Sequence, residues 1–291
     1  MRESSSARAV SGLDPLGPML GDLRLVTFMT DFGLRDPSAG VLSGVVLAMT
    51  PNARTLDLTH AIPPYDVEAG AEALVESLVH LPVGAHVAVV DPGVGTQRRP
   101  IAIRCLRGDV LIGPDNGLLL PAAKALGGVA AVVVLDDERW WGPSRSHTFH
   151  GRDLFAPVAA HLAAGVRFGD LGSPLDASLL VPAAALPLEV KGDELHTVVR
   201  IVDGFGTLVL AGDRSDISAA LGTLEPGLPL TITIGDQTIS TVWASRFGDV
   251  PEGAPLCYID SAGRLALAVN RGSAAATYGA GRRTPITIKR S

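Results

Sequence analysis

The first half of the chain alternates short apolar runs with segments that place apolar residues at helical spacing. Strands that are apolar on both faces are typical of a sheet covered by helices on both sides. The apolar runs are Leu23–Thr30, Ala53–Thr59, His86–Asp91, Pro100–Leu106, Val110–Gly117 and Ala130–Leu135. Helices are predicted over Ser38–Met49, Asp66–His80 and Asp153–Ala164. We therefore expect an α/β domain with a central, mostly parallel sheet flanked by helices.

The pattern changes after Gly172. Residues 181–192 form a linker that begins with a Pro/Ala-rich stretch, and short strand-like runs separated by Gly and Asp follow it. These runs lie at 195–203, 206–212, 228–235, 237–244, 255–263, 264–270 and 285–290. They predict a smaller all-β domain, a barrel or a sandwich. The expected organisation is a flexible tail at 1–22, an α/β domain at 23–180, the linker, and a β domain at 193–291.

Composition excludes several classes of partner. The formal net charge is −6 and no basic stripe is present, which argues against nucleic-acid binding. The first residues lack the apolar core of a signal peptide, and no apolar run is long enough to span a bilayer. Cys105 and Cys257 are isolated in apolar runs, without the spacing of a disulfide framework or a zinc site. We expect a cytoplasmic protein with reduced thiols and no membrane contact.

Polar side chains gather where predicted strands end, which is where α/β sheets bind ligands. Asp31 follows the first strand, with Asp36 and Ser38 just after it. A carboxylate in this place can accept hydrogen bonds from the vicinal hydroxyls of a ribose. A turn or helix-capping aspartate is an equally good interpretation of this segment alone.

The loop that runs from Asp91 to Arg99 follows another strand. Its glycines let a ligand approach the backbone, but Arg98 occupies the place of the third glycine of a dinucleotide fingerprint, and no Walker motif is present. Asp91 and Arg98 are therefore interpreted as a charged pair that holds a small polar reactant. A structural ion pair across the loop is the alternative.

The segment His147–Asp153 supplies His150, which suits proton handling near neutral pH. Together with Asp31, Asp91 and His60, its histidines also raise the possibility of a metal site. No HExxH or similarly compact ligand motif is present, so we expect no metal and no cofactor.

Taken together, these segments resemble the S-adenosylmethionine (SAM) hydroxide adenosyltransferase family, which is related to the SAM-dependent fluorinase and chlorinase. The matching segments occur in family order, and DPGVGTxRR and TFHGRD are the most specific of them. They are Thr30–Asp36, Leu56–Ala71, Val87–Arg99, Ile112–Leu119, Thr148–Gly165, Val202–Gly206 and Ile259–Ala275. The resemblance implies hydrolysis of SAM to adenosine and methionine. It also implies a homotrimer whose sites lie between the N-domain of one subunit and the C-domain of its neighbour.

The resemblance also implies roles for individual residues. The water-activating aspartate, arginine and histidine of the family fall on Asp91, Arg98 and His150; either Asp91 or His150 accepts the proton. The substrate-binding positions implied, including the weaker candidates Asn116 and Phe247, are Asp31, Asp36, Ser38, Tyr65, Asn116, Asp203, Phe205, Phe247 and Ser261. The chain departs from the family pattern in four places: Thr207 replaces an Asn, residues 209–211 lack a Thr-Asn pair, Asp260 replaces the Asn before Ser261, and Ser38 stands where hydrolases often carry Tyr.

Two other functions compete with hydrolysis. A halide-using SAM transferase would form a 5′-halo-5′-deoxyadenosine, but the resemblance to the halide enzymes does not extend to the Asp–Arg–His set. A non-catalytic SAM or adenosine sensor would have no need of that set. A metal-dependent hydrolase ranks below both.

Overall fold

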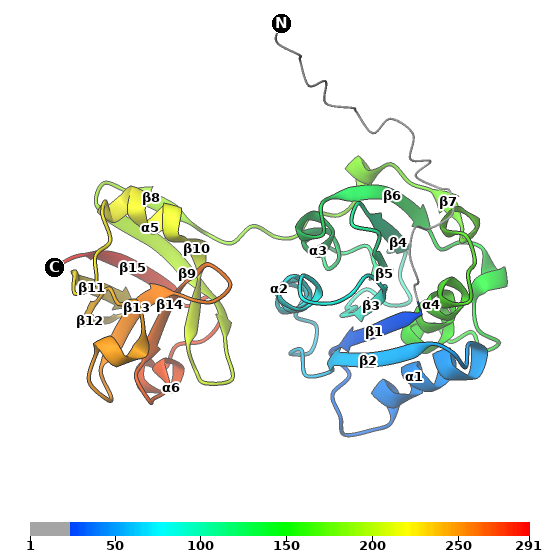
Figure 1. Ribbon diagram of the computed structural model, residues 1–291, viewed down its shortest axis with the longest axis horizontal. Coiled ribbons are helices and arrows are strands. Elements are labelled where there is room, and N and C mark those ends of the chain that lie inside the picture. The colour runs from blue at the N-terminus through cyan, green and yellow to red at the C-terminus, as the bar shows by residue number, and fades with distance from the viewer. Residues whose placement is uncertain (1–23) are drawn as a thin grey trace, which may run out of the picture. The chain divides into compact units, whose positions relative to one another are not determined.

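The computed structural model describes residues 24–291 as two compact units, one reaching Ala184 and the other covering Ala185–Ser291 (Figure 1). The tail expected at 1–22 lies outside the described residues. Each unit has its own sheet and its own hydrophobic core, so each is described by itself.

The N-terminal unit is built on a seven-stranded sheet in the order β2-β1-β3-β5-β4-β6-β7. Its strands are β1 (Leu25–Thr30), β2 (Arg54–Thr59), β3 (Ala85–Val89), β4 (Pro100–Cys105), β5 (Val110–Pro114), β6 (Val129–Val134) and β7 (Ser173–Pro174). β2, β1, β3 and β5 pair in parallel, whereas β4 pairs antiparallel with both β5 and β6, and β7 pairs antiparallel with β6. The sheet is therefore mixed and mostly parallel in strand direction.

Helices cover both faces of this sheet (Figure 1). The helices are α1 (Ser38–Met49), α2 (Val67–Leu78), α3 (Leu120–Ala125) and α4 (Ala156–Ala163), with short 3₁₀ turns at Glu138–Trp140, Phe168–Asp170 and Ala177–Leu179. Along β5, Ile112 packs in the core under α1 and α4, while Leu111 packs in the core under α2 and α3. The nearly continuous apolar runs follow from this double burial.

Two local features of the N-terminal unit differ from the sequence prediction. The helix expected from Asp153 begins earlier, as one π-helical turn at Gly151–Phe155, and becomes α-helical only at Ala156. The short helix α3 and the strand β7 were not predicted, because two to six residues carry too little periodicity to be recognised.

The C-terminal unit is an antiparallel sheet in the order β12-β11-β15-β9-β10-β14-β13, with β8 beside β9. Its strands are β8 (Glu189–Lys191), β9 (Glu194–Val202), β10 (Leu208–Asp213), β11 (Pro229–Ile234), β12 (Gln237–Val242), β13 (Pro255–Ile259), β14 (Arg264–Val269) and β15 (Pro285–Arg290). A bridge between Trp243 and Cys257 brings the two ends of this order together, so the sheet is nearly closed.

All seven strand-like runs of the second half are strands, but the unit is not purely β. It also holds α5 (Arg214–Leu221), α6 (Ala274–Tyr278) and a 3₁₀ turn at Phe247–Asp249. The capping box of Asp213 and Asp216 starts α5, and the Ser273 hydroxyl caps α6.

Two further sequence expectations concern the thiols and the membrane. Cys105 and Cys257 are buried and unpaired, and burial raises the pKa of each thiol to about 12. Within residues 24–291, no helix is long and apolar enough to cross a bilayer.

Candidate active site

The carboxyl ends of β1 and β3 open into one cavity of the N-terminal unit, with a volume of about 360 Å³. These strands are adjacent and parallel, with Thr30 opposite Val89, so Asp31 and Asp91 emerge side by side. The lining residues are Asp31, Phe32, Pro64, Tyr65, Val89, Asp91, Val94, Thr148, Phe149, His150 and Gly151. Four segments that are distant in sequence therefore meet at the edge where α/β sheets bind ligands.

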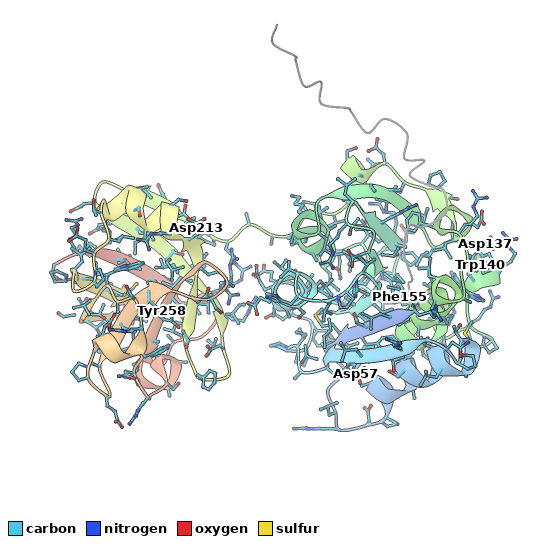
Figure 2. The ribbon with its side chains drawn as sticks, in the orientation of Figure 1. Asp57, Asp137, Trp140, Phe155, Asp213 and Tyr258 are labelled. Carbon is cyan, nitrogen blue, oxygen red and sulfur yellow. The ribbon has the colours of Figure 1, made fainter. Side chains whose placement is uncertain are left out.

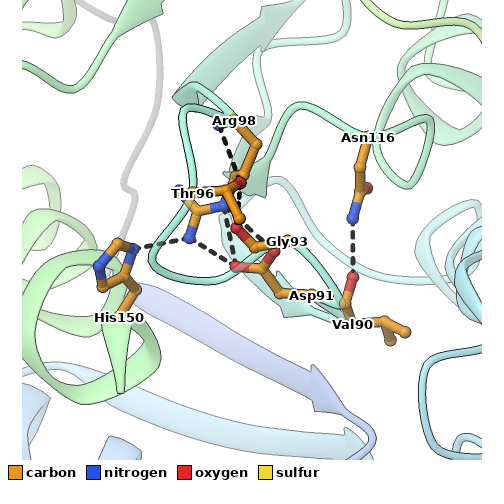
Figure 3. A network of polar contacts seen from close by, with 7 residues as sticks. All are labelled: Val90, Asp91, Gly93, Thr96, Arg98, Asn116 and His150. Carbon is orange, nitrogen blue, oxygen red and sulfur yellow. Dashed lines mark hydrogen bonds and ion pairs between the residues drawn. The ribbon is translucent and has the colours of Figure 1, made fainter. Parts of the chain in front are cut away.

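Arg98 connects Asp91 to His150 (Figure 3). Its Nε donates to both carboxylate oxygens of Asp91, at 3.1 Å to Oδ1 and 2.9 Å to Oδ2, and its Nη2 lies 2.5 Å from Oδ2. The same Nη2 lies 2.7 Å from Nδ1 of His150. Asp91 and His150 line the cavity, whereas Arg98 does not and its side chain is only 9% exposed. Arg98 therefore lies outside the cavity lining and hydrogen-bonds both cavity residues.

The contact with Arg98 fixes the protonation of His150. A guanidinium only donates hydrogen bonds, so Nδ1 of His150 must present its lone pair to Nη2. The neutral ring then carries its proton on Nε2. Burial of the ring and the charge of Arg98 both lower the pKa of His150 below its ordinary value of 6.5, which favours the same neutral form.

This geometry predicts the acid limb of the pH profile. Protonation of Nδ1 would break the bond from Arg98 and place two cations together, so we expect kcat/KM to be constant above pH 6.5 and to fall only below it. The stability that comes from neutral His150 has the same sign: it is present above pH 6.5 and is lost as pH falls through the lowered pKa. Steady-state rates across this range, with His150→Gln as the variant that should lose this limb, test it. A rate that keeps rising well above pH 6.5 would contradict the assignment.

The π-helical turn that begins at Gly151 packs buried side chains against His150. Phe155 lies in the π-helical turn, its ring 6.4 Å from the His150 ring and 5.4 Å from the Arg98 guanidinium carbon. Asp153, in the same turn, accepts the main-chain N–H of Ser146 at 2.8 Å and so ties down the preceding loop. π-Helical turns are frequent at functional sites, where they re-aim side chains.

Gly95 brings the loop of Arg98 against the loop of His150. Its φ is +77°, and a Cβ placed on it would lie 2.8 Å from the carbonyl oxygen of His147. Two independent features therefore require glycine at this position.

Gly95→Ala is accordingly expected to push the two loops apart, lengthen the Arg98–His150 bond and lower kcat about tenfold or more. The matched control is Gly165→Ala, because Gly165 also has positive φ (+96°) but has nothing within 4 Å of the added Cβ. The control isolates backbone strain, of about 1–3 kcal/mol, from the clash. Equal kcat losses in both variants would refute the role given to the close approach.

Asp31 is held by a main-chain group rather than by a side chain. The N–H of Tyr65 donates to Oδ2 of Asp31 at 2.8 Å, and Tyr65 has a φ of +66°. Such a conformation is uncommon outside glycine and marks a constrained loop. The bond aims the carboxylate into the cavity, where its remaining acceptor capacity suits a hydroxyl pair. The Tyr65 ring is 73% exposed at the cavity rim.

Three predicted substrate-binding positions of the N-terminal unit do not line this cavity. Asp36 and Ser38 bond to each other, with the Ser38 N–H 2.8 Å from Asp36 Oδ1. Asn116 donates to the carbonyl oxygen of Val90 at 2.9 Å (Figure 3). Two cavity residues without a predicted role are Phe32 and Phe149, whose rings meet edge to face with centroids 5.6 Å apart. Their positions inside the TDFG and TFHGRD motifs were the available signal.

The C-terminal unit has its own cavity of about 580 Å³, lined by Asp203, Phe205, Thr207, Phe247, Tyr258, Val269, Arg271 and Gly272. It gathers three of the four predicted residues of this unit; Ser261 is exposed and outside the lining. Tyr258, labelled in Figure 2, packs edge to face against Phe247, with the ring centroids 5.3 Å apart. Oδ1 of Asp203 accepts hydrogen bonds from the N–H groups of Phe205 and Thr207, and these bonds stabilise the turn at the cavity edge.

The departure at Asp260 has a structural explanation. Its Oδ1 accepts the N–H groups of Ala262 and Arg264, and its Oδ2 accepts Nε of Arg264 at 2.8 Å. The carboxylate is therefore committed to the β13–β14 turn. For metal binding, the described part of the chain offers no group of three or more His, Cys, Asp or Glu residues in a ligating arrangement.

The fold and the paired cavities define an α/β unit with a carboxylate–guanidinium–imidazole site, joined to a nearly closed β unit. The sequence profile of the SAM hydroxide adenosyltransferase N-terminal domain matches residues 26–172, and that of the C-terminal domain matches residues 197–287. The chain belongs to the SAM hydroxide adenosyltransferase family.

Individual relatives agree with this assignment. The (R)-S-adenosyl-L-methionine hydrolase of Salinispora arenicola is 44% identical over 86% of this chain and 92% of its own length. The fluorinase of Actinoplanes sp. is 29% identical over 92% of this chain and 98% of its own length. A crystal structure of an uncharacterised conserved protein from Thermotoga maritima superposes with a TM-score of 0.84, at 30% identity, over 91% of this chain and all of that one.

Proposed function

We propose that this chain hydrolyses SAM to adenosine and L-methionine, and that its substrate is the (R) epimer at the sulfonium sulfur. The relatives that are hydrolases carry the (R) designation in their names, at up to 44% identity over most of the chain. One observation carries the proposal: Asp91 and His150 line the same cavity, and Arg98, outside the lining, hydrogen-bonds both of them.

The geometry supports a division of roles among these three residues. His150 has no free lone pair, because Nδ1 accepts from Arg98 and Nε2 holds the proton. Arg98 does not accept protons at all. Asp91 is the remaining acceptor, and its Oδ1 receives only the longer 3.1 Å bond from Arg98. We therefore assign Asp91 as the group that takes the proton from water, His150 Nε2–H as a donor to the water oxygen, and Arg98 as their support.

The reaction is a displacement at C5′ of the adenosyl group. The water oxygen attacks C5′, the C5′–S bond breaks, and its electron pair stays on sulfur. Methionine leaves as a neutral thioether, so no acid is needed, and the water proton passes to Asp91 and then to solvent. Alignment of the water in line behind C5′ is the main contribution of the site, since such positioning supplies up to about 7–11 kcal/mol. The reaction proposed needs no metal and no cofactor.

The remaining residues are assigned to substrate binding. Asp31, oriented by Tyr65, accepts the ribose hydroxyls. The methionine and adenine portions of SAM are assigned to residues of the C-terminal unit. These are the rings of Phe205 and Phe247, the carboxylate of Asp203 and, from the family pattern, Ser261. From the family pattern, we further propose a cytoplasmic homotrimer in which neighbouring copies complete each site; light scattering measures the mass of the assembly.

The decisive test is incubation with each sulfonium epimer of SAM in isotopically labelled water. We expect adenosine labelled at the 5′-oxygen, faster from the (R) epimer, and unchanged by EDTA. Added fluoride or chloride distinguishes the halide alternative, whose product is a 5′-halo nucleoside. Binding of SAM without turnover would instead identify a sensor, and activity lost to EDTA and restored by a divalent ion would identify a metal enzyme.

A further inference from the structure

The turn after β5, residues 115–117, lies beside the loop from Asp91 to Arg99, called the reactive loop below, but outside the cavity lining. Both functional ends of the Asn116 side chain are engaged by main chain. Nδ2 donates to the carbonyl oxygen of Val90 at 2.9 Å (Figure 3), and Oδ1 accepts the N–H of Leu118 at 3.2 Å. Val90 is fully buried and directly precedes Asp91. Asn116 therefore fixes the point at which the reactive loop leaves β3.

The neighbouring Asp115 holds the other end of the same loop. Its N–H donates to the carbonyl oxygen of Arg99 at 2.9 Å. Its Oδ2 accepts Nε and Nη2 of Arg99 at 2.9 and 2.5 Å. Arg99 follows Arg98 directly, so this pair fixes the point at which the loop enters β4. Asp115 is 6% exposed, so its charge is held away from solvent by these bonds.

The same aspartate fastens the beginning of the interdomain linker. Oδ1 of Asp115 accepts the N–H of Val181 at 2.9 Å, and Nη2 of Arg99 donates to the carbonyl oxygen of Leu179 at 2.5 Å. The main chain of the linker also packs on Gly117, where a Cβ would lie 2.9 Å from the carbonyl oxygen of Pro182. One short turn thus joins both ends of the reactive loop to the linker.

We propose that Asn116 and Asp115 are positioning residues: the turn they form braces the reactive loop at both ends, so that Asp91 and Arg98 meet His150 in the reactive geometry. This inference rests on the proposed function and assigns Asn116 a role in positioning rather than in substrate contact. A braced loop matters because a displacement of about 1 Å at a reacting group costs up to 10²-fold in rate.

The test separates positioning from binding through kcat and KM. Asn116→Ala removes both side-chain bonds, and Asn116→Asp is isosteric, keeps the acceptor for Leu118 and removes only the donor to Val90. We expect both variants to lose about 10- to 100-fold in kcat for adenosine formation, with KM within about twofold of the native value. A rise in KM with native kcat would overturn the proposal, because it would show a residue that binds substrate.

Controls keep this result interpretable. Asn52→Asp makes the same charge change at an exposed turn before β2, and should leave kcat and KM unchanged. If Asn116→Asp alone loses activity while Asn116→Ala keeps it, added charge explains the loss and the brace is refuted. Asp115→Ala with Arg99→Met removes the side-chain bonds to Val181 and Leu179 without leaving an unpaired charge; we expect lower kcat and faster hydrogen exchange at the Val181 amide.

The proposed function and the brace fail in different ways. Native protein that forms no adenosine from SAM refutes the function, whatever the variants do. Native protein that is active, together with folded Asn116 variants of native kcat, refutes the brace alone. Circular dichroism and the thermal midpoint establish folding, and Asn116→Asp supplies the isosteric variant should Asn116→Ala not fold.

Discussion

Asp91→Asn is expected to lower kcat for adenosine formation by about 10²–10⁴-fold, the range that general acid–base groups contribute. Asparagine has the shape of aspartate and keeps one acceptor for Arg98, but it does not take a proton from water. Because His150 presents its lone pair to Arg98, no other described side chain of the Asp91–Arg98–His150 set replaces the lost acceptor. Quenched-flow or steady-state measurement of adenosine gives the loss directly.

A matched control is available on the same unit. Asp137, labelled in Figure 2, forms an ion pair with Arg139. Its Nη2–Oδ2 distance is 2.5 Å, equal to that between Arg98 and Asp91. Asp137 lies outside the site cavity, so Asp137→Asn should leave kcat unchanged. Activity within tenfold of native in Asp91→Asn would return the role of proton acceptor to His150, and His150→Gln would then show the larger loss.

Much of the site's position follows from rules that apply to any α/β sheet. Asp31 and Asp91 end predicted parallel strands, and ligands bind at that edge. Their proximity additionally requires β1 and β3 to be neighbours, which the sequence does not reveal because β2 lies between them along the chain. Strand order depends on long-range packing, and apolar runs of similar composition do not encode it.

The three-residue network was predictable only through the resemblance. Arg98 and His150 are separated by 52 positions, and no local pattern pairs them. Their contact depends on Gly95 allowing the loops to approach and on the π-helical turn after His150, neither of which hydrophobic periodicity reports. The sequence left open whether Asp91 or His150 accepts the proton. The structure bears on this choice because the Nδ1 lone pair of His150 already accepts a hydrogen bond from Arg98.

Asn116 illustrates a different limit. A polar side chain in a turn near a site is equally consistent with ligand contact and with main-chain support. The structure directs the two ends of the amide at the main chain of Val90 and Leu118, which the sequence does not reveal. The buried cluster around Asp109 was not predictable from the sequence for a similar reason. Arg107 and Asp109 flank a glycine, a pattern that is typical of an exposed turn.

That cluster predicts the largest effect on stability. Asp109 is fully buried beside β5 and accepts Nη2 of Arg107 at 2.8 Å and Nε2 of His86 at 3.0 Å on Oδ1. Nε of Arg107 donates to Oδ2 at 2.7 Å, and Nδ1 of His86 meets the hydroxyl of Thr27 at 2.9 Å. Burial by itself would raise the pKa of Asp109, but the hydrogen bonds from Arg107 and His86 outweigh it and hold the pKa well below 3.8.

Asp109→Ala is therefore expected to lower the free energy of unfolding by about 3–5 kcal/mol, because it leaves Arg107 and His86 without their buried partner. Urea denaturation should show a lower midpoint at an unchanged slope. The lowered pKa sets the sign of the pH effect: this stability is present above pH 3.8 and is lost as pH falls towards the native pKa. The variant, lacking the carboxylate, should lose less stability over that interval than the native chain.

The same variant distinguishes stability from catalysis. Ala85 pairs with Val110, so His86 and Asp109 lie at the opposite end of β3 and β5 from Asp91. The folded fraction of Asp109→Ala should accordingly keep native kcat, whereas Asp91→Asn should lose kcat while unfolding at a midpoint closer to native. A loss in unfolding free energy below about 1 kcal/mol would contradict this prediction. It would show that the cost of burying the Asp109 charge equals the stabilisation from its bonds to Arg107 and His86.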